Sequence, residues 1–222
     1  LPDTLSKICN EKNKAFIHLS ALGIENAKNS LYAQSKLEGE NKIRKNHLKA
    51  IIIKPSIVFS VSDSLTTKFM SILNILPAFP LYYKGNTKFM PIHASEIADL
   101  LFYIIDRGIT SKSIEAVGPE VLTFKKILQV LLKCINKKKL LIPVPLPIAK
   151  LSAVFFQIMP KPLITLDQLK LLKYDNIKSG KYETNFDIGC PSEITLEQVV
   201  MKYAYNWMDG GKYSIKKINN KK

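Results

Sequence analysis

Residues 20–36 read SALGIENAKNSLYAQSK and contain the three side chains on which the interpretation of this chain depends. Ser20 ends a short apolar run, and Tyr32 and Lys36 follow in a segment with helical spacing. Tyrosine and lysine four residues apart lie on one face of a helix, one turn apart. An ammonium group held there favours the phenolate and is expected to lower the pKa of Tyr32. A serine hydroxyl beside that phenol can donate a hydrogen bond to the same substrate oxygen.

Serine, tyrosine and lysine in this arrangement are typical of hydride transfer with a nicotinamide cofactor. A tuned phenol can pass a proton to or from a substrate oxygen near neutral pH. The alternative is an exposed helix with an incidental tyrosine–lysine pair, since the chain has nine tyrosines and is rich in lysine. The flanking segments decide between these interpretations.

Those flanking segments predict a strand, a loop, a helix and a second strand. Residues 15–19 and 50–54 are apolar runs, and the first is expected to be a strand buried on both faces of a parallel sheet. A helix is expected at about 31–45, between them. A crossover of this kind brings the carboxyl ends of both strands to one edge of the sheet. Ser20 and Pro55 are therefore expected there, together with the start of the helix that carries the tyrosine–lysine pair.

Further helices and strands are expected along the rest of the chain. Threonines stand before three of the helical segments as N-cap residues, at Thr123, Thr165 and Thr195. The expected helices are 66–76, 96–106, 123–135, 148–159, 166–173 and 196–208, and the expected strands are 113–117 and 140–144.

The composition limits the classes of partner. The chain has 222 residues, of which 46% are apolar, and a net charge of +15. A core of this size fits one domain, or one domain with an appended lobe. Nearly all the positive charge is lysine, since Arg44 and Arg107 are the only arginines. Arginine is the preferred residue for bidentate phosphate and base recognition, so no nucleic-acid partner is expected. An anionic membrane surface or an acidic partner remains open.

Neither a metal site nor a disulfide framework is expected. Cys9, Cys134 and Cys190 are widely separated, which favours a reducing compartment and a role as small buried apolar side chains. No apolar run reaches the length of about 20 residues that spans a bilayer. Residues 146–159 are expected to form a buried or interfacial helix, with docking to a membrane or a partner as the alternative.

The other titratable residues are given structural roles. His18, inside an apolar run, is expected to be a core histidine, and His47 a solvated one. His93 is expected at the entry of a helix, with the substrate cleft as the alternative. Glu38 and Glu40 are expected on a solvated helix face.

An ordered series of segments identifies a family resemblance. In chain order they are HLSALG (18–23), YAQSKLEGE (32–40), KPSIVF (54–59), FMPIHASEIA (89–98), GPEVLT (118–123), PVP (143–145), LITLDQL (163–169) and DN (175–176). The series resembles extended short-chain dehydrogenase/reductases, also described as NAD-dependent epimerase/dehydratases. Within them it resembles the atypical subgroup typified by the nucleotide-binding accessory subunit of respiratory complex I and its bacterial homologues. The resemblance covers almost the entire chain.

The resemblance implies an α/β fold, a partial Rossmann doubly wound parallel sheet with a smaller mixed α/β carboxy-terminal lobe, that binds NADP(H) or NAD(H). It implies that Ser20 polarises a substrate carbonyl or hydroxyl and that Tyr32 is the general acid/base. Lys36 would hold the nicotinamide ribose and tune the tyrosine. Pro55 and the backbone near Ile57 would pack against the nicotinamide end.

The resemblance also implies a division of the chain. Residues 1–120 would be the carboxy-terminal half of the Rossmann domain, interleaved with lobe segments at about 64–90. Residues 121–211 would form a mostly helical substrate-type or partner lobe, and 212–222 a basic tail.

Three departures from the family pattern matter. The glycine-rich phosphate loop, G-x-x-G-x-x-G, is absent and is expected to precede Leu1, so that the chain would be an amino-terminally truncated piece of a longer protein. Ser60 stands where glycine is usual. Glu96 stands where aspartate is common, and it is expected to cap the helix start or to meet a partner.

Three functions are consistent with these features. The first is an accessory or assembly protein of respiratory complex I in which the nucleotide is structural. The second is an active NAD(P)-dependent epimerase, dehydratase or reductase acting on a nucleotide sugar or small carbonyl substrate, and the third is a scaffold without cofactor. The expected location is the cytoplasm, or peripherally the cytoplasmic face of the inner membrane, or the matrix side of a mitochondrion.

Overall fold

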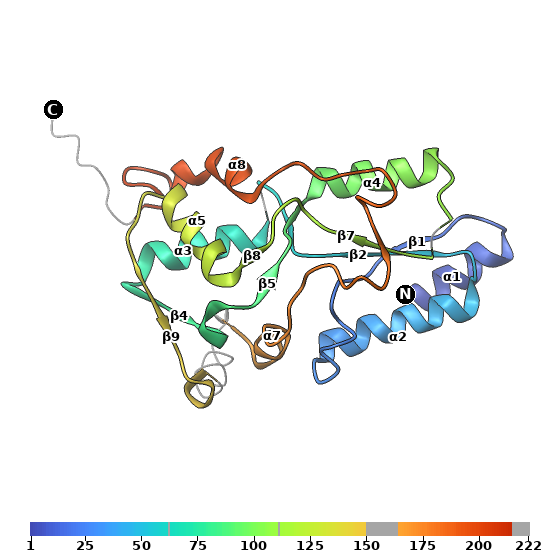
Figure 1. Ribbon diagram of the computed structural model, residues 1–222, viewed down its shortest axis with the longest axis horizontal. Helices are drawn as coiled ribbons and strands as arrows, with labels where there is room; N and C mark the ends of the chain where they lie inside the picture. Colours follow the sequence, from blue (N-terminus) through green and yellow to red (C-terminus); the bar gives the residue numbers. More distant parts are fainter. Residues whose placement is uncertain (62, 111, 150–163, 215–222) are drawn as a thin grey trace.

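A parallel sheet covered by helices on both faces forms one side of the molecule (Figure 1). The computed structural model describes residues 1–61, 63–110, 112–149 and 164–214. Four strands lie in the order β1 (Ile17–Leu19), β2 (Ile51–Pro55), β7 (Ser113–Ala116) and β10 (Glu183–Thr184), and every pairing is parallel. Helices α1 (Pro2–Glu11) and α2 (Leu31–Asn46) lie against one face, and α4 (Ala94–Asp106) lies against the other. The predicted α/β class and parallel crossover are confirmed.

Strand β2 shows why the sheet is covered on both sides. Successive side chains of a strand point to opposite faces. Ile51 and Ile53 pack with Leu100 of α4, whereas Ile52 packs with Ile43 of α2. A continuous isoleucine run therefore supplies both halves of the core around the sheet.

Strand β1 differs from its prediction. It begins at Ile17, and among the described strands it pairs only with β2. Leu19 is consequently 42% exposed, and His18 is only half-buried. The expected burial of this strand on both faces is wrong, as is the expected core position of His18.

Most of the remaining elements pack around a second hydrophobic cluster at the left of Figure 1. We call this cluster the aromatic core, because Phe59, Phe79, Phe124 and Trp207 are buried in it. Tyr82 and Leu169 instead belong to a third cluster, and Ile92 packs with residues of the sheet. The remaining elements are β3 (Val58–Phe59), α3 (Ser64–Ile75), β4 (Ala78–Leu81), η1 (Tyr82–Gly85), β5 (Lys88–Phe89), β6 (Ile92–His93), β8 (Leu122–Thr123), α5 (Phe124–Cys134), β9 (Leu140–Pro143), α7 (Leu166–Leu171), α8 (Leu196–Met201) and η2 (Ala204–Trp207). Strands β3–β6 and β4–β9 pair in parallel, and β5–β8 pair antiparallel.

Helix starts follow the predicted capping. Thr123, Thr165 and Thr195 each accept a backbone N–H from the first turn of α5, α7 and α8. Helix α8 ends at Met201, earlier than expected, because the backbone at Tyr203 leaves the helical region before η2 begins.

Gly118 allows a close approach between two chain segments. A Cβ atom at this position would lie 1.6 Å from the carbonyl oxygen of Pro91. Only glycine lets the loop after β7 pass this close to the segment before β6.

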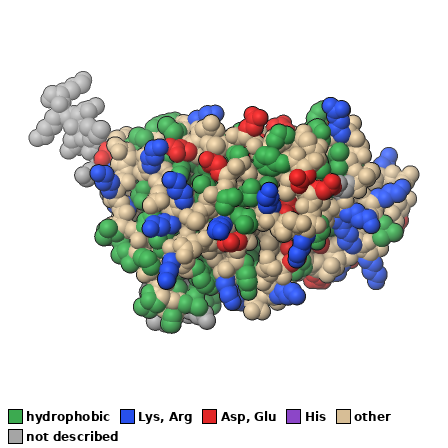
Figure 2. All heavy atoms as spheres, in the orientation of Figure 1, with side chains coloured by type: hydrophobic (Ala, Val, Ile, Leu, Met, Phe, Trp, Pro, Cys, Tyr) green, Lys and Arg blue, Asp and Glu red, His purple; other side chains and the backbone are tan. Residues whose placement is uncertain are grey.

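The charged residues are dispersed over the surface. Figure 2 shows lysine and arginine side chains spread over the visible face, with acidic side chains among them. No helix in the part of the chain that the structure describes is both long and apolar enough to cross a bilayer. Most of the predicted helix 148–159 and the end of the basic tail lie outside the described residues.

Candidate functional site

The parallel ladder continues beyond β1 and holds the loop that carries Ser20. The Ser20 N–H donates to the Ile53 carbonyl at 2.8 Å, and the Leu22 N–H donates to the Pro55 carbonyl at 2.9 Å. Ser20 is 5% exposed. The structure therefore brings Ser20 and Pro55 to the same edge of the sheet.

Helix α2 brings Tyr32 and Lys36 to this edge. Ser30 is its N-cap residue and accepts the Ala33 N–H at 3.3 Å. The Lys36 Nζ lies 5.9 Å from the centroid of the Tyr32 ring and donates to the Leu19 carbonyl at 3.2 Å. The lysine thus bridges the tyrosine ring and the end of β1.

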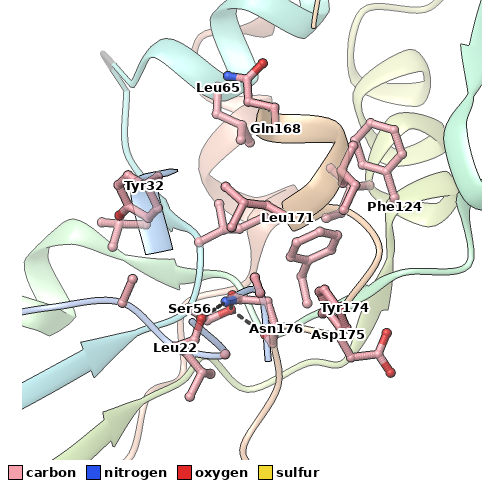
Figure 3. Close-up of a pocket in the computed structure, with 18 of the residues that line it drawn as sticks. Leu22, Tyr32, Ser56, Leu65, Phe124, Gln168, Leu171, Tyr174, Asp175 and Asn176 are labelled. Carbon is pink, nitrogen blue, oxygen red and sulfur yellow. Dashed lines mark hydrogen bonds between the residues drawn. The ribbon is translucent and has the colours of Figure 1, made fainter. Parts of the chain in front are cut away.

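A cavity of about 670 Å³ opens at this edge, between the sheet and the aromatic core (Figure 3). Its lining includes Ser20, Tyr32, Pro55 and Ile57, whereas Lys36 is not among the lining residues. Four of the five predicted site residues therefore face one space, with the lysine behind the tyrosine.

The pKa of Tyr32 contradicts its prediction. Partial burial disfavours the charged phenolate and raises the pKa of Tyr32 above its ordinary value. The expected lowering by Lys36 is wrong in this structure.

Glu40 is buried beneath the site, which corrects its predicted exposure. Its side chain accepts the Ser20 hydroxyl and lies 2.8 Å from the Lys54 ammonium. Lys54 is 1% exposed and also contacts Glu25 at 2.5 Å. Burial alone would lower the pKa of Lys54, but the hydrogen bonds that its ammonium donates to these two carboxylates outweigh it, and the pKa is raised. We call Ser20, Glu25, Glu40 and Lys54 the ionic network.

The ionic network determines whether the Ser20 hydroxyl donates or accepts a hydrogen bond with a ligand. A serine hydroxyl has one hydrogen and two lone pairs. Since the hydrogen goes to Glu40, only lone pairs remain for the cavity. Ser20 is therefore oriented to accept a hydrogen bond from a ligand rather than to donate one.

Asp167 of α7 is a second site residue whose role the sequence did not reveal. Its carboxylate accepts the Ser30 hydroxyl at 2.8 Å, the Leu31 N–H at 2.8 Å and the Tyr32 N–H at 3.2 Å. It thereby neutralises the positive end of α2. Lys170 of α7 adds a bond to the Asn29 carbonyl at 2.9 Å. Helix α7 thus fixes the position of the first turn of α2, which contains Tyr32.

Asn176 joins the segments that follow β1 and β2 to its own loop, and it lines the cavity. Its side chain accepts the Ser56 hydroxyl at 2.7 Å and donates to the Leu22 carbonyl at 2.5 Å, as Figure 3 shows for Ser56. The neighbouring Asp175 accepts the Lys88 N–H at 2.8 Å. The resemblance had marked residues 175–176, but their contacts could not be read from the sequence.

The predictions for His93 and His47 have different outcomes. His93 is the N-cap of α4, as expected, and Glu96 completes the capping box while also accepting the Ile194 N–H at 2.9 Å. His47 is 5% exposed, with Nε2 2.9 Å from the Lys14 carbonyl, so its predicted solvation is wrong. Within the described residues, no cluster of histidine, cysteine and acidic side chains could hold a metal ion.

Curated relatives of this chain are subunits of a respiratory enzyme. None of the known protein-family models matches the chain. It is 25% identical over 182 residues to the mitochondrial 40 kDa subunit of NADH-ubiquinone oxidoreductase from Neurospora crassa, covering 81% of this chain and 48% of that subunit. It is 23% identical over 175 residues to mitochondrial NADH dehydrogenase [ubiquinone] 1 alpha subcomplex subunit 9 from Arabidopsis thaliana, covering 74% and 44%. The chain spans about half the length of the curated relatives it matches.

Solved structures with the same fold include two nucleotide-sugar enzymes. DesIV, a dTDP-glucose 4,6-dehydratase from Streptomyces venezuelae, aligns with a TM-score of 0.65 and 14% identity over 91% of this chain and 63% of DesIV. UDP-glucuronic acid 4-epimerase from Bacillus cereus aligns with a TM-score of 0.63 and 14% identity, covering 91% and 65%. At these identities the likeness shows the fold alone. The chain is therefore a distant homologue of the 40 kDa and 1 alpha subcomplex 9 subunits of complex I, with the Rossmann-like fold of short-chain dehydrogenase/reductases.

Proposed function

We propose that this protein is a nucleotide-binding accessory or assembly protein of respiratory complex I, in which NADP(H) or NAD(H) has a structural role. The observation that carries the proposal is the similarity to complex I subunits over 81% and 74% of the chain. Its partners would be complex I subunits. Its location would be the face of the membrane on which the matrix or cytoplasmic arm of that enzyme lies, with an anionic membrane surface as a second contact.

We place the nicotinamide end of the cofactor at the cavity edge. Ser20 and Tyr32 would hold the nicotinamide and its ribose, Pro55 and Ile57 would pack against the ring, and Lys36 would reach the ribose hydroxyls. All but Lys36 line the cavity, which supports this assignment. When bound, such a cofactor supplies hydride transfer.

Two features favour a structural nucleotide over turnover. Ser20 presents lone pairs to the cavity because its hydrogen goes to Glu40, so it cannot polarise a carbonyl without leaving that partner. The raised pKa of Tyr32 favours a neutral phenol, which suits hydrogen bonding to a ribose better than it suits a general base.

An active NAD(P)-dependent epimerase, dehydratase or reductase is the second candidate. The retained serine, tyrosine and lysine and the shared fold with DesIV favour it. Fold and residues do not establish turnover, because function depends on the site. Turnover of a nucleotide sugar that disappears in Tyr32→Phe would establish this candidate. A scaffold without cofactor is the third candidate.

The first experiment tests association. A tag is placed on the full-length protein in its native cells, and the respiratory complexes are separated on native gels. We expect the tagged protein to migrate with complex I or with one of its assembly intermediates. Migration apart from every complex I species would refute the accessory role.

The second experiment tests the cofactor. The purified full-length protein is denatured and the released nucleotides are identified by mass spectrometry. We expect NADP(H) or NAD(H) near one per chain for wild type, and loss of it in Lys36→Ala. Lys42→Ala is the matched control, since this exposed lysine lies on the same helix and pairs with Glu38. If the wild-type protein releases no nucleotide, the result would instead support the third candidate, a scaffold protein without cofactor.

A further inference from the structure

The outer face of β9 is apolar, although a strand at the surface usually carries polar side chains there. Leu141 packs against the aromatic core. Its neighbours Leu140 and Ile142 belong to the other face, because successive side chains of a strand alternate. Both are exposed, Leu140 at 68%. Both faces of β9 are therefore apolar, but only one of them packs against the protein core.

The exposed apolar surface continues beyond the strand. Four large aliphatic side chains between residues 140 and 148 are exposed, and we call them the β9 patch: Leu140, Ile142, Leu146 and Ile148. Figure 1 places β9 at the lower left of the molecule, and Figure 2 shows hydrophobic side chains gathered at that end. Exposed apolar surface concentrated in this way marks a site of interaction.

Lysines border the β9 patch at the start of the strand. Lys138 and Lys139 immediately precede Leu140, and Lys138 is exposed. Lys137 differs from them, because its ammonium pairs with Asp209. Residues 136–149 contain no aspartate or glutamate. Aliphatic side chains beside lysines, without acidic residues, match a partner that is apolar inside and negative at its surface, as an anionic bilayer is.

The composition favours a bilayer over a protein partner. Protein interfaces are enriched in aromatic residues and arginine and depleted in lysine. Residues 138–148 contain lysine but neither an aromatic residue nor arginine. A partner strand could in principle pair along β9, since β9 pairs only with β4 among the described strands. Prolines 143, 145 and 147 limit such pairing to the start of the strand, because they have no N–H group.

We propose that the β9 patch docks this protein on an anionic membrane surface. Its leucine and isoleucine side chains enter the boundary between headgroups and acyl chains, and Lys138 and Lys139 lie at the lipid phosphates. The missing N–H groups of the prolines suit this position, because fewer backbone donors lose water there. The proposal rests on the membrane location in the proposed function, and it assigns the surface that makes the contact.

The test is co-sedimentation of the purified full-length protein with vesicles of phosphatidylcholine, either alone or mixed with phosphatidylserine. We expect binding to the mixed vesicles that weakens as salt is added. Leu140→Glu should weaken this binding by about tenfold or more. Leu48→Glu is the matched control, because Leu48 is 74% exposed, lies next to Lys49 and gives the same change in net charge.

A second variant tests the same patch without changing an apolar side chain. Lys138→Gln should weaken binding to the mixed vesicles by about fivefold, because a lysine near an anionic membrane contributes about that factor. It should leave binding to phosphatidylcholine alone unchanged. Lys49→Gln is its control, since Lys49 is also exposed. Thermal unfolding verifies that all four variants fold.

The outcomes separate this proposal from the proposed function. Absence of binding to the mixed vesicles, equal binding by Leu140→Glu and wild type, or an equal loss in Leu48→Glu would each overturn it. If Leu140→Glu lost only its migration with complex I on native gels, the β9 patch would be a protein interface and the proposal would be wrong. Vesicle binding by a protein that migrates apart from complex I would support the β9 patch and refute the accessory role.

Discussion

In strand β2 of the sheet a lysine lies buried between two glutamates, whereas the buried members of the aromatic core carry no charge. Lys54 is 1% exposed within the ionic network, and Leu131 is fully buried in the aromatic core. A buried ion pair adds little net stability, but losing either partner is costly, so it holds its members in place. Apolar packing stabilises in proportion to the area buried and tolerates exchange of similar shapes. The ionic network thus orients Ser20 through charged hydrogen bonds, and the aromatic core is held by apolar packing.

Replacing Lys54 should lower the free energy of unfolding more than any other change predicted here. Lys54→Met leaves Glu40 buried without its cation, and we expect unfolding in urea to require about 3–5 kcal/mol less free energy. In the double variant Lys54→Met/Glu40→Leu most of that loss should be recovered, since the side chain of Glu25 is 35% exposed and can be solvated. If the double variant is as unstable as the single one, the loss is not caused by the unpaired charge of Glu40, and the ionic network stabilises the fold in another way.

In the aromatic core, the effect of a substitution should depend only on the side-chain volume that it removes. Leu131→Ala removes a fully buried side chain and should cost about 3 kcal/mol in the free energy of unfolding, within the usual range for such cavities. Because no charge is involved, the loss in the free energy of unfolding should be the same at neutral and alkaline pH.

The loss in the free energy of unfolding caused by Lys54→Met should instead become smaller as the pH rises. The pKa of Lys54 is raised in the folded state, so its contribution is complete below the unfolded value and is lost as the pH rises through the folded pKa.

Asp167 joins α7 to the start of α2, and its removal should have an intermediate effect. Asp167→Ala frees three donors at the start of α2, and we expect a loss of about 1–2 kcal/mol in the free energy of unfolding. Partial burial would raise the pKa of Asp167, but hydrogen bonds from Ser30 and from the Leu31 and Tyr32 backbones outweigh it, and the pKa is lowered.

The pH dependence of this effect has a definite sign. Because the pKa of Asp167 is lower in the folded state, its stabilisation is complete above the unfolded value of about 3.9 and is lost as the pH falls through the folded pKa. Urea unfolding of wild type and Asp167→Ala should therefore differ by a constant amount near neutral pH and converge in acid. A difference that persists in acid would show that the carboxylate charge is not responsible.

The smallest effect is expected at the edge of the aromatic core. Thr195→Ala removes the side-chain cap of α8 and should cost about 1 kcal/mol, with Thr195→Ser restoring most of it. Hydrogen exchange should localise the change to α8. An effect as large as that of Leu131→Ala would mean that the cap also positions the chain before it.

Local patterns in the sequence predicted several elements correctly, because their causes lie within a few residues. The isoleucine run of β2, the helical spacing of α2 and the capping threonines at Thr123, Thr165 and Thr195 are of this kind. The meeting of Ser20 with Pro55 was also predictable, because parallel strands end at the same edge.

Contacts made across the chain were not predictable. Glu40 has the spacing of a solvated helix residue, and only the position of Lys54 on the facing strand makes it a buried partner. Asp167 caps a helix that begins 136 residues earlier. The pKa of Tyr32 was predicted in the wrong direction, because the pair spacing indicated a nearby ammonium and could not indicate how much water the fold removes.

Chain order and hydrophobic period were enough to predict the parallel crossover, the family resemblance and the residues at the end of the sheet. The hydrogen-bonding roles of those residues follow from contacts that form only in the folded protein. In the structure the Ser20 hydroxyl donates to Glu40, the Asp167 carboxylate accepts the Tyr32 N–H, and phenylalanine side chains line the same cavity as Ser20 and Tyr32. Hydrogen-bond direction and desolvation depend on neighbours that are distant in the chain, and a linear pattern does not contain them.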